Sequence, residues 1–127
     1  MNVQAHSDRL SQQLAQVEAN LLDGVPQDIP LATKLVEYLK KLPGKRIRPQ
    51  LLLIASEGLG VSGETSIVDA IQMERIHATT LIHDDVIDEA MTRRGNPSVN
   101  AQWGNAVAVV FGDLLFSVLV AQAVFDP

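Results

Sequence analysis

A run of acidic side chains near the middle of the sequence has the spacing of a divalent-metal site. In HDDVIDEAMTRRG, residues 83–95, Asp84 and Asp85 are adjacent and Asp88 follows one helical turn after Asp84. On a helix Asp84 and Asp88 project from one face, with His77 on the same face two turns earlier. Two such carboxylates suit Mg²⁺, which keeps several waters and completes its octahedron with substrate phosphates. The motif alone leaves open a solvated acidic helix end.

The segment PGKRIRP, residues 43–49, has the composition of an anion-binding loop. Gly44 allows the backbone to approach an anion closely. Lys45, Arg46 and Arg48 supply charges and forked donors that suit phosphate. The alternative is a solubilising charge run in a loop.

Arg93 and Arg94 follow directly after the acidic run. They either bind an anion or only neutralise the acidic turn before them. Together with the basic loop they indicate two phosphorylated ligands. One ligand would be bridged by metal, and the other would be held mainly by Lys and Arg.

The elements that must position these residues are helical almost throughout. Apolar residues recur at helical spacing, prolines and glycines punctuate the chain between them, and no alternating strand pattern is evident. The predicted helices span residues 5–22, 30–41, 49–59, 66–90 and 98–125. We predict an all-α protein, an antiparallel helix bundle that forms a single domain over residues 1–127.

The last predicted helix is apolar enough to require a membrane check. From Ala106 to Phe125 its clearly polar residues are Asp113, Ser117 and Gln122. A central aspartate costs about 2.5–3.5 kcal/mol on membrane insertion, and Gly112 beside it suits a packed or functional position. We therefore expect a buried helix of a soluble bundle and no transmembrane segment. Such a helix needs partners on every side, which indicates an oligomer or a longer chain.

Composition excludes several classes of protein. The net charge of -5 and an aromatic content of 4% disfavour a nucleic-acid binder. The chain has no cysteine, so it has neither disulfides nor thiolate chemistry. The N-terminus lacks the pattern of a signal peptide. We expect a cytoplasmic protein.

Three motifs, in this order and spacing, resemble a known family: GKRIRP, HATTLIHDDVID and RRGNPSVNAQWGNAVAVVFGDLL. They are similar to the N-terminal part of trans-type polyprenyl diphosphate synthases, and HATTLIH is similar to the long-chain, octaprenyl or solanesyl type. The resemblance runs from about Lys34 to the end and implies the N-terminal part of an isoprenoid-synthase-type helical fold. Pro43 stands where the family often has glycine. The family's second aspartate-rich motif is not found in these 127 residues.

The resemblance implies a role for each motif residue. Asp84 and Asp88 are implied as ligands of Mg²⁺ that chelates an allylic diphosphate, with Asp85 in support and Arg93 as a further contact to that diphosphate. The isopentenyl diphosphate site is implied at Lys45, Arg48, His77 and Arg94. Magnesium and arginine would neutralise the departing diphosphate, so that the allylic carbon can ionise. The homoallylic double bond would then attack the cation, and a proton would be lost.

Product length is implied by the turn before the aspartates. Helical side chains lean toward the N-terminus, so Thr79 and Thr80 should line the space below the diphosphate. In the family, bulky aromatics here stop elongation early, whereas small residues leave the pocket open. The long-chain type is therefore expected; the alternative is that the threonines fill a helix interface. Family members are usually homodimers, and a peripheral membrane contact for product release is an open option.

Three hypotheses follow for the chain as a whole. The first is the N-terminal portion of a long-chain prenyltransferase, which binds diphosphate with Mg²⁺ but turns over little or nothing alone. The second is a non-catalytic diphosphate-binding or regulatory subunit of a heteromeric synthase. The third is an acidic helix bundle with no diphosphate role.

Overall fold

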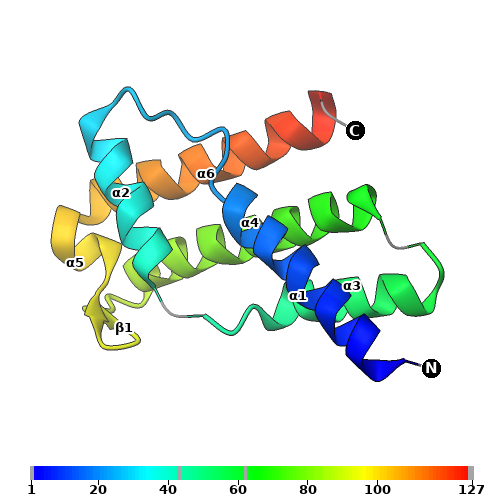
Figure 1. Ribbon diagram of the computed structural model, residues 1–127. Helices are drawn as coiled ribbons and strands as arrows, with labels where there is room; N and C mark the ends of the chain where they lie inside the picture. The colour runs from blue at the N-terminus through cyan, green and yellow to red at the C-terminus, as the bar shows by residue number, and fades with distance from the viewer. Residues whose placement is uncertain (1, 43, 62, 126–127) are drawn as a thin grey trace. The chain divides into compact units, whose positions relative to one another are not determined.

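A computed structural model of the chain describes residues 2–42, 44–61 and 63–125, and within them helices predominate (Figure 1). In chain order the elements are α1 (Val3–Asn20), α2 (Pro30–Lys41), α3 (Ile47–Gly58), α4 (Glu64–Ile87), β1 (Thr92–Arg93), β2 (Asn96–Pro97), α5 (Val99–Trp103) and α6 (Asn105–Phe125). The predicted all-α class is confirmed. The short β1–β2 pair is an addition that the sequence did not predict.

Two of the predicted helices differ clearly from the structure, and the other bounds of α1, α3 and α4 differ by one or two residues. The helix predicted over residues 98–125 is broken into α5 and α6 at Gly104, whose φ of 92° lies outside the helical region. The helix predicted to reach residue 90 ends at Ile87, because Glu89 adopts a left-handed φ of 53°. By contrast, the second helix has its predicted bounds, with Pro30 in the first turn, where its missing N–H costs nothing.

The chain divides into two compact units, which are described separately. The first comprises Met1–Asp23 and Lys45–Glu74, and the second comprises Gly24–Gly44 and Arg75–Pro127. Helix α4 therefore contributes its first half to one unit and its second half to the other. The single domain expected from the sequence stays a prediction.

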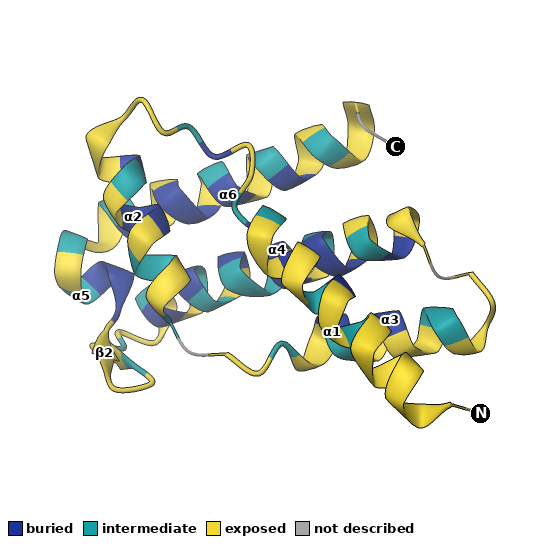
Figure 2. Ribbon diagram, viewed as in Figure 1, coloured by how far each residue is buried: buried dark blue, intermediate teal, exposed yellow. Residues whose placement is uncertain are grey.

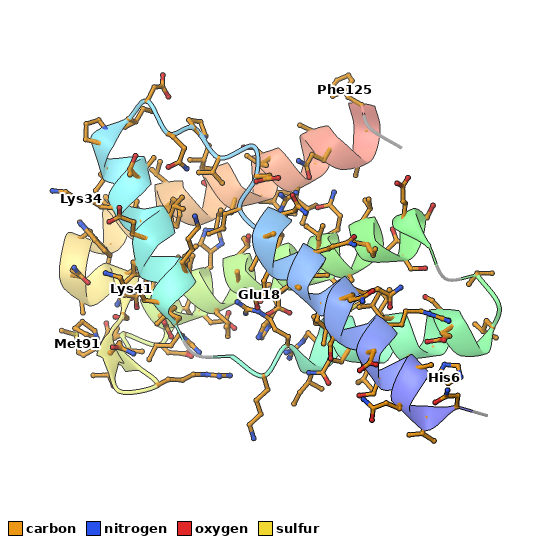
Figure 3. The ribbon with its side chains drawn as sticks, in the orientation of Figure 1. His6, Glu18, Lys34, Lys41, Met91 and Phe125 are labelled. Atoms are coloured by element: carbon orange, nitrogen blue, oxygen red, sulfur yellow. The ribbon has the colours of Figure 1, made fainter. Side chains whose placement is uncertain are left out.

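The first unit is built on contacts between α1, α3 and the first half of α4. Its buried core consists of Val17, Leu53, Ala70 and Ile71. At the edge of this core His6, labelled in Figure 3, contacts Glu57 of α3 at 2.6 Å, and Arg9 contacts the same carboxylate oxygen at 2.6 Å. These contacts fix α1 on α3.

In the second unit, α6 buries one side and exposes the other (Figure 2). The buried side carries Ala108, Phe111, Leu115 and Leu119. The exposed side carries Val110, Phe116 and Val124, and Phe125, labelled in Figure 3, is 83% exposed at the end of the helix. The expectation of a helix buried on every side is therefore not met within this chain.

Helix α6 is also the helix, among the described residues, that is long and apolar enough to cross a membrane. That property rests on length and composition, and core helices of soluble proteins share it.

Candidate functional site

The acidic run lies on the last turn of α4 and is held in helical geometry beyond the end of that helix. The N–H of Asp88 donates to the carbonyl of Asp84 at 2.8 Å, so Asp88 follows Asp84 by one helical turn, as predicted. Both side chains are exposed, whereas Asp85 between them is buried. Adjacent carboxylates thus face different surroundings.

The helix ends in a Schellman motif directly after Asp88. The N–H of Ala90 donates to the carbonyl of Asp85 at 2.9 Å, and that of Glu89 donates to Val86 at 3.3 Å. Glu89 occupies the left-handed position where glycine is usual. Two side chains reinforce this end: Ser98 Oγ and Asn100 Nδ2 both donate to the carbonyl of Ala90, at 2.7 and 2.9 Å. The metal-binding candidates therefore sit on a well-anchored helix terminus.

Asp85 forms a two-pronged ion pair with Arg93. Arg93 Nε donates to Asp85 Oδ2 at 2.7 Å, and Nη2 donates to Oδ1 at 2.6 Å. These hydrogen bonds raise the pKa of Arg93, while its partial burial acts in the opposite direction. A pair of this geometry fixes the plane of the guanidinium. Arg93 is therefore held beside the acidic run.

The two arginines lie on a hairpin whose turn explains their placement. Arg93 pairs with Asn96 across the antiparallel β1–β2 ladder, which leaves Arg94 and Gly95 as the two-residue turn. Their φ values of 50° and 82° are both positive, as a type I′ turn requires. Arg93 points back to Asp85, whereas Arg94 is exposed at the tip.

Tyr38 of α2 anchors this hairpin. Its hydroxyl donates to the carbonyl of Pro97, and its ring meets Trp103 edge to face, with centroids 5.5 Å apart. Burial raises the pKa of the Tyr38 hydroxyl, the charge of Asp85 raises it further, and Arg93 lowers it. Tyr38 therefore lies within the electrostatic reach of the Asp85–Arg93 pair.

His83 fixes α4 on α6. Its Nε2 lies 3.1 Å from the carbonyl oxygen of Val109 and 3.5 Å from Oδ1 of Asp113. Its ring also occupies the space where a side chain at Gly112 would begin. Asp113, the central polar residue of the apolar helix, is therefore a neighbour of the acidic run.

Residues 45–49 of the basic loop lie in the first unit, and their cationic side chains have different roles. Arg46 adopts a left-handed φ of 51° and bonds the carboxylates of Glu18 and Glu74, the latter at 3.0 Å. Its hydrogen bond to Glu18 is the largest cause of its raised pKa, with burial opposing it. Lys45 and Arg48 on either side are exposed. Arg46 is thus committed to holding α1, α3 and α4 together, and Pro43 lies outside the described residues.

The remaining candidates lie along the second half of α4. His77 is half-buried. Thr79 is buried, with no hydrogen-bond partner for its hydroxyl within the described ranges. Thr80 is exposed, and its hydroxyl donates to the carbonyl of His77 at 2.8 Å. The two threonines therefore occupy different environments, and their role in a product pocket stays a prediction.

The donor set at the end of α4 fits Mg²⁺ bound together with a diphosphate. Across the described residues no group of three or more His, Cys, Asp and Glu side chains is arranged to hold a metal ion. Asp84 and Asp88 nevertheless offer two exposed carboxylates, and neither makes a hydrogen bond or ion pair with its side chain in this part of the chain. Magnesium commonly takes one or two protein carboxylates and completes its shell with water and phosphate oxygens.

Comparison with known proteins identifies the family. The family model described as polyprenyl synthetase matches residues 29–124, which is most of the chain. The chain belongs to the polyprenyl synthetase family. It is 37% identical over 117 residues to octaprenyl diphosphate synthase of Escherichia coli, and this match covers 92% of the chain and 36% of the relative. It is 38% identical to heptaprenyl diphosphate synthase component 2 of Geobacillus stearothermophilus, covering 92% of the chain and 37% of that protein.

Solved structures confirm the fold. A polyprenyl synthase of Caulobacter crescentus, crystallised with calcium and isoprenyl diphosphate, superposes with a TM-score of 0.82 at 33% identity. The match covers 92% of this chain and 37% of that one. The chain therefore spans just over a third of the length of the relatives that it matches.

Sequence reasoning missed three contributors to the candidate site of this family member. Tyr38 carries no motif signal, because its role depends on a contact with the hairpin. Asn100 lies in the quoted RRGNPSVNAQ segment, but its hydrogen bond to the end of α4 depends on the chain reversal. His83 begins the acidic run, where the carboxylates carry the stronger signal, although the glycine at position 112 gives a partial one.

Proposed function

We propose that this chain binds an allylic diphosphate through Mg²⁺ held by Asp84 and Asp88, as part of a prenyltransferase that condenses it with isopentenyl diphosphate. The observation that carries the proposal is that the carboxylates at the end of α4 differ in their exposure and in their partners. Two carboxylates one turn apart are exposed, while the carboxylate between them holds an arginine at their side. The polyprenyl synthetase family and the names of its relatives support the same reaction class.

The residues of the acidic end would act mainly by electrostatics. Magnesium bound there would supply positive charge to a departing diphosphate. Arg93 keeps its guanidinium beside that position, because Asp85 holds two of its nitrogens. Its remaining N–H groups would contact diphosphate oxygens without further ordering, and such preorganised donors are the effective ones in catalysis. Asp85 is then a positioning residue, and Asp84 and Asp88 are the metal ligands.

We assign the isopentenyl diphosphate site to Lys45, Arg48, His77 and Arg94. Lys45 and Arg48 flank Arg46, whose bonds to Glu18 and Glu74 fix the loop that carries them. Arg94 is placed at the exposed tip of the hairpin. The support is the exposure of Lys45, Arg48 and Arg94 next to structurally anchored neighbours, together with the family. For His77 the support is the family alone.

We also propose a long-chain product, a homo-oligomeric enzyme and a cytoplasmic location. The small side chains of Thr79 and Thr80 and the similarity to an octaprenyl diphosphate synthase support the long product. The exposed apolar side of α6 suits burial against a neighbour. A peripheral membrane contact would serve release of such a product.

A non-catalytic or regulatory subunit is the second candidate. The similarity to a protein named as component 2 of a heptaprenyl diphosphate synthase supports the heteromeric assembly that this candidate requires. Diphosphate binding is common to both candidates, whereas a requirement for a second, different chain distinguishes them.

Calorimetric titration with farnesyl diphosphate in the presence and absence of Mg²⁺ tests the proposal. We expect binding that requires Mg²⁺ and is lost in Asp84→Ala. Asp69→Ala is the matched control, because Asp69 is an exposed aspartate of the same helix, outside the acidic run. Equal affinity in the wild type and Asp84→Ala would refute the metal site. Condensation assays on the chain alone and mixed with candidate partner chains then separate enzyme from subunit.

A further inference from the structure

The ring of His83 fills a notch in α6 that exists only because residue 112 is glycine. A Cβ built on Gly112 would lie 2.2 Å from Nε2 and 2.5 Å from Cδ2 of His83, distances that real contacts essentially never show. Gly112 is buried and lies inside α6, so glycine is needed there for space and not for an unusual φ. The imidazole of His83 therefore packs on α6 only because residue 112 has no side chain.

A hydrogen bond to α6 fixes the orientation of the His83 ring in this contact. With its proton on Nε2, the imidazole donates to the carbonyl of Val109, 3.1 Å away. Asp113 Oδ1, at 3.5 Å, is the charged group that faces the same nitrogen from α6. Val109, Gly112 and Asp113 occupy one turn of α6. The ring is therefore held by one turn of the neighbouring helix.

His83 and Asp85 together hold two sides of α4. Successive helical residues are about 100° apart, so residues 83 and 85 project about 160° apart around the axis. His83 fixes one side to α6, and Asp85 fixes the other to the hairpin through Arg93. Asp84 lies between them and is exposed. The two anchors thus fix α4 on either side of Asp84 and leave its carboxylate exposed.

We infer that His83 is a positioning residue for the diphosphate site. Its packing against Gly112 and its hydrogen bond to Val109 fix the position of the end of α4, and therefore the positions of Asp84 and Asp88. The inference rests on the proposed function of those two carboxylates. Replacing a group that orients metal-ligating side chains, without binding the metal itself, commonly lowers metal affinity by about 10- to 100-fold. The expected effect of removing the ring is therefore large, although His83 itself touches no ligand.

The test is calorimetric titration of the full chain with inorganic diphosphate and Mg²⁺. We expect His83→Ala and Gly112→Ala each to weaken binding about tenfold or more. His83→Gln should bind like the wild type, because its amide N–H can reach the Val109 carbonyl. His83→Asn should not, because its amide is one bond shorter. The double variant His83→Ala/Gly112→Ala should bind no more weakly than His83→Ala, because the ring that a methyl group at position 112 would strike is gone.

Each outcome has one meaning, with thermal melts reporting whether a variant is folded. Wild-type affinity in His83→Ala, or the same loss from Gly112→Ala in both backgrounds, would overturn the inference. Should His83→Ala fail to fold, the Gln and Asn variants decide, and equal affinities would overturn it. Wild-type affinity in Asp84→Ala would instead refute the proposed function, and the positioning role with it.

Discussion

Arg93 donates two hydrogen bonds to the carboxylate of Asp85, at 2.7 and 2.6 Å, whereas the side chain of the adjacent Asp84 is exposed. Asp85 thus contributes to the fold, whereas Asp84 is the carboxylate of the two that we propose as a metal ligand. Replacing each in turn should therefore give opposite patterns of damage.

We expect Asp85→Asn to lower the free energy of unfolding by about 1–3 kcal/mol, because a bidentate charged pair is lost and the partly buried Arg93 is left with a neutral partner. Asp84→Asn should change it by less than about 0.5 kcal/mol, as exposed substitutions usually do. Urea denaturation measures both. Equal losses would show that the ion pair contributes nothing specific.

Alkaline titration should reveal the surroundings of Tyr38. Burial and the charge of Asp85 raise the pKa of its hydroxyl above the ordinary 10.0. The folded state therefore favours the neutral phenol. This contribution to stability is complete below the ordinary pKa and is lost as pH rises through the folded value.

Ultraviolet absorbance of tyrosinate measures this pKa directly, because Tyr38 is the single tyrosine of the chain. We expect the midpoint above pH 10.0 in the folded protein and near the ordinary value in concentrated urea. Tyr38→Phe is the control. It should show no transition and should lose the hydrogen bond to Pro97. A folded-state midpoint at or below that in urea would contradict the assignment.

The left-handed residue that ends α4 offers a stabilising substitution. Glu89→Gly should raise the free energy of unfolding by about 1 kcal/mol, because glycine adopts the φ of 53° without strain. Glu89→Ala removes the same charge but keeps the strained Cβ, so it should give no such gain. Urea denaturation curves compare the two. An equal gain in both would assign the effect to charge.

Arg46 should behave as a structural residue despite its place in the basic loop. Arg46→Lys should cost about 1–3 kcal/mol of unfolding free energy, because the single nitrogen of lysine cannot reproduce the three nitrogens with which Arg46 bonds Glu18 and Glu74. Arg9→Lys is the matched control on the same unit. Its side chain is 53% exposed in its pair with Glu57, and such pairs contribute about 0–1 kcal/mol. Similar losses in the two variants would argue against a structural role specific to Arg46.

The helices and the helical spacing of Asp84 and Asp88 could be predicted because their signals are local. Pro30 marks the start of a helix, and the spacing of Asp84 and Asp88 places both on one face. The hairpin could not be predicted in this way. Its strands are two residues long, too short for an alternating pattern, and Arg94 replaces the asparagine or aspartate that usually marks a type I′ turn.

The anchoring of the site was beyond local reasoning. The Asp85–Arg93 pair joins residues on opposite sides of a chain reversal. The packing of His83 against Gly112 joins two helices. Arg46 resembles an anion ligand of a cationic loop, because the sequence does not show that Glu18 and Glu74 come within its reach.

The hydrogen bond from the N–H of Asp88 to the carbonyl of Asp84 has a thermodynamic consequence. It joins the two proposed metal ligands in one ordered turn, so a ligand that bridges them would have to immobilise two short side chains and no backbone. Segments that fold upon binding show a large negative heat-capacity change from the surface they bury. A receptor whose backbone is ordered in advance lacks that contribution, and its affinity depends on charge and desolvation instead.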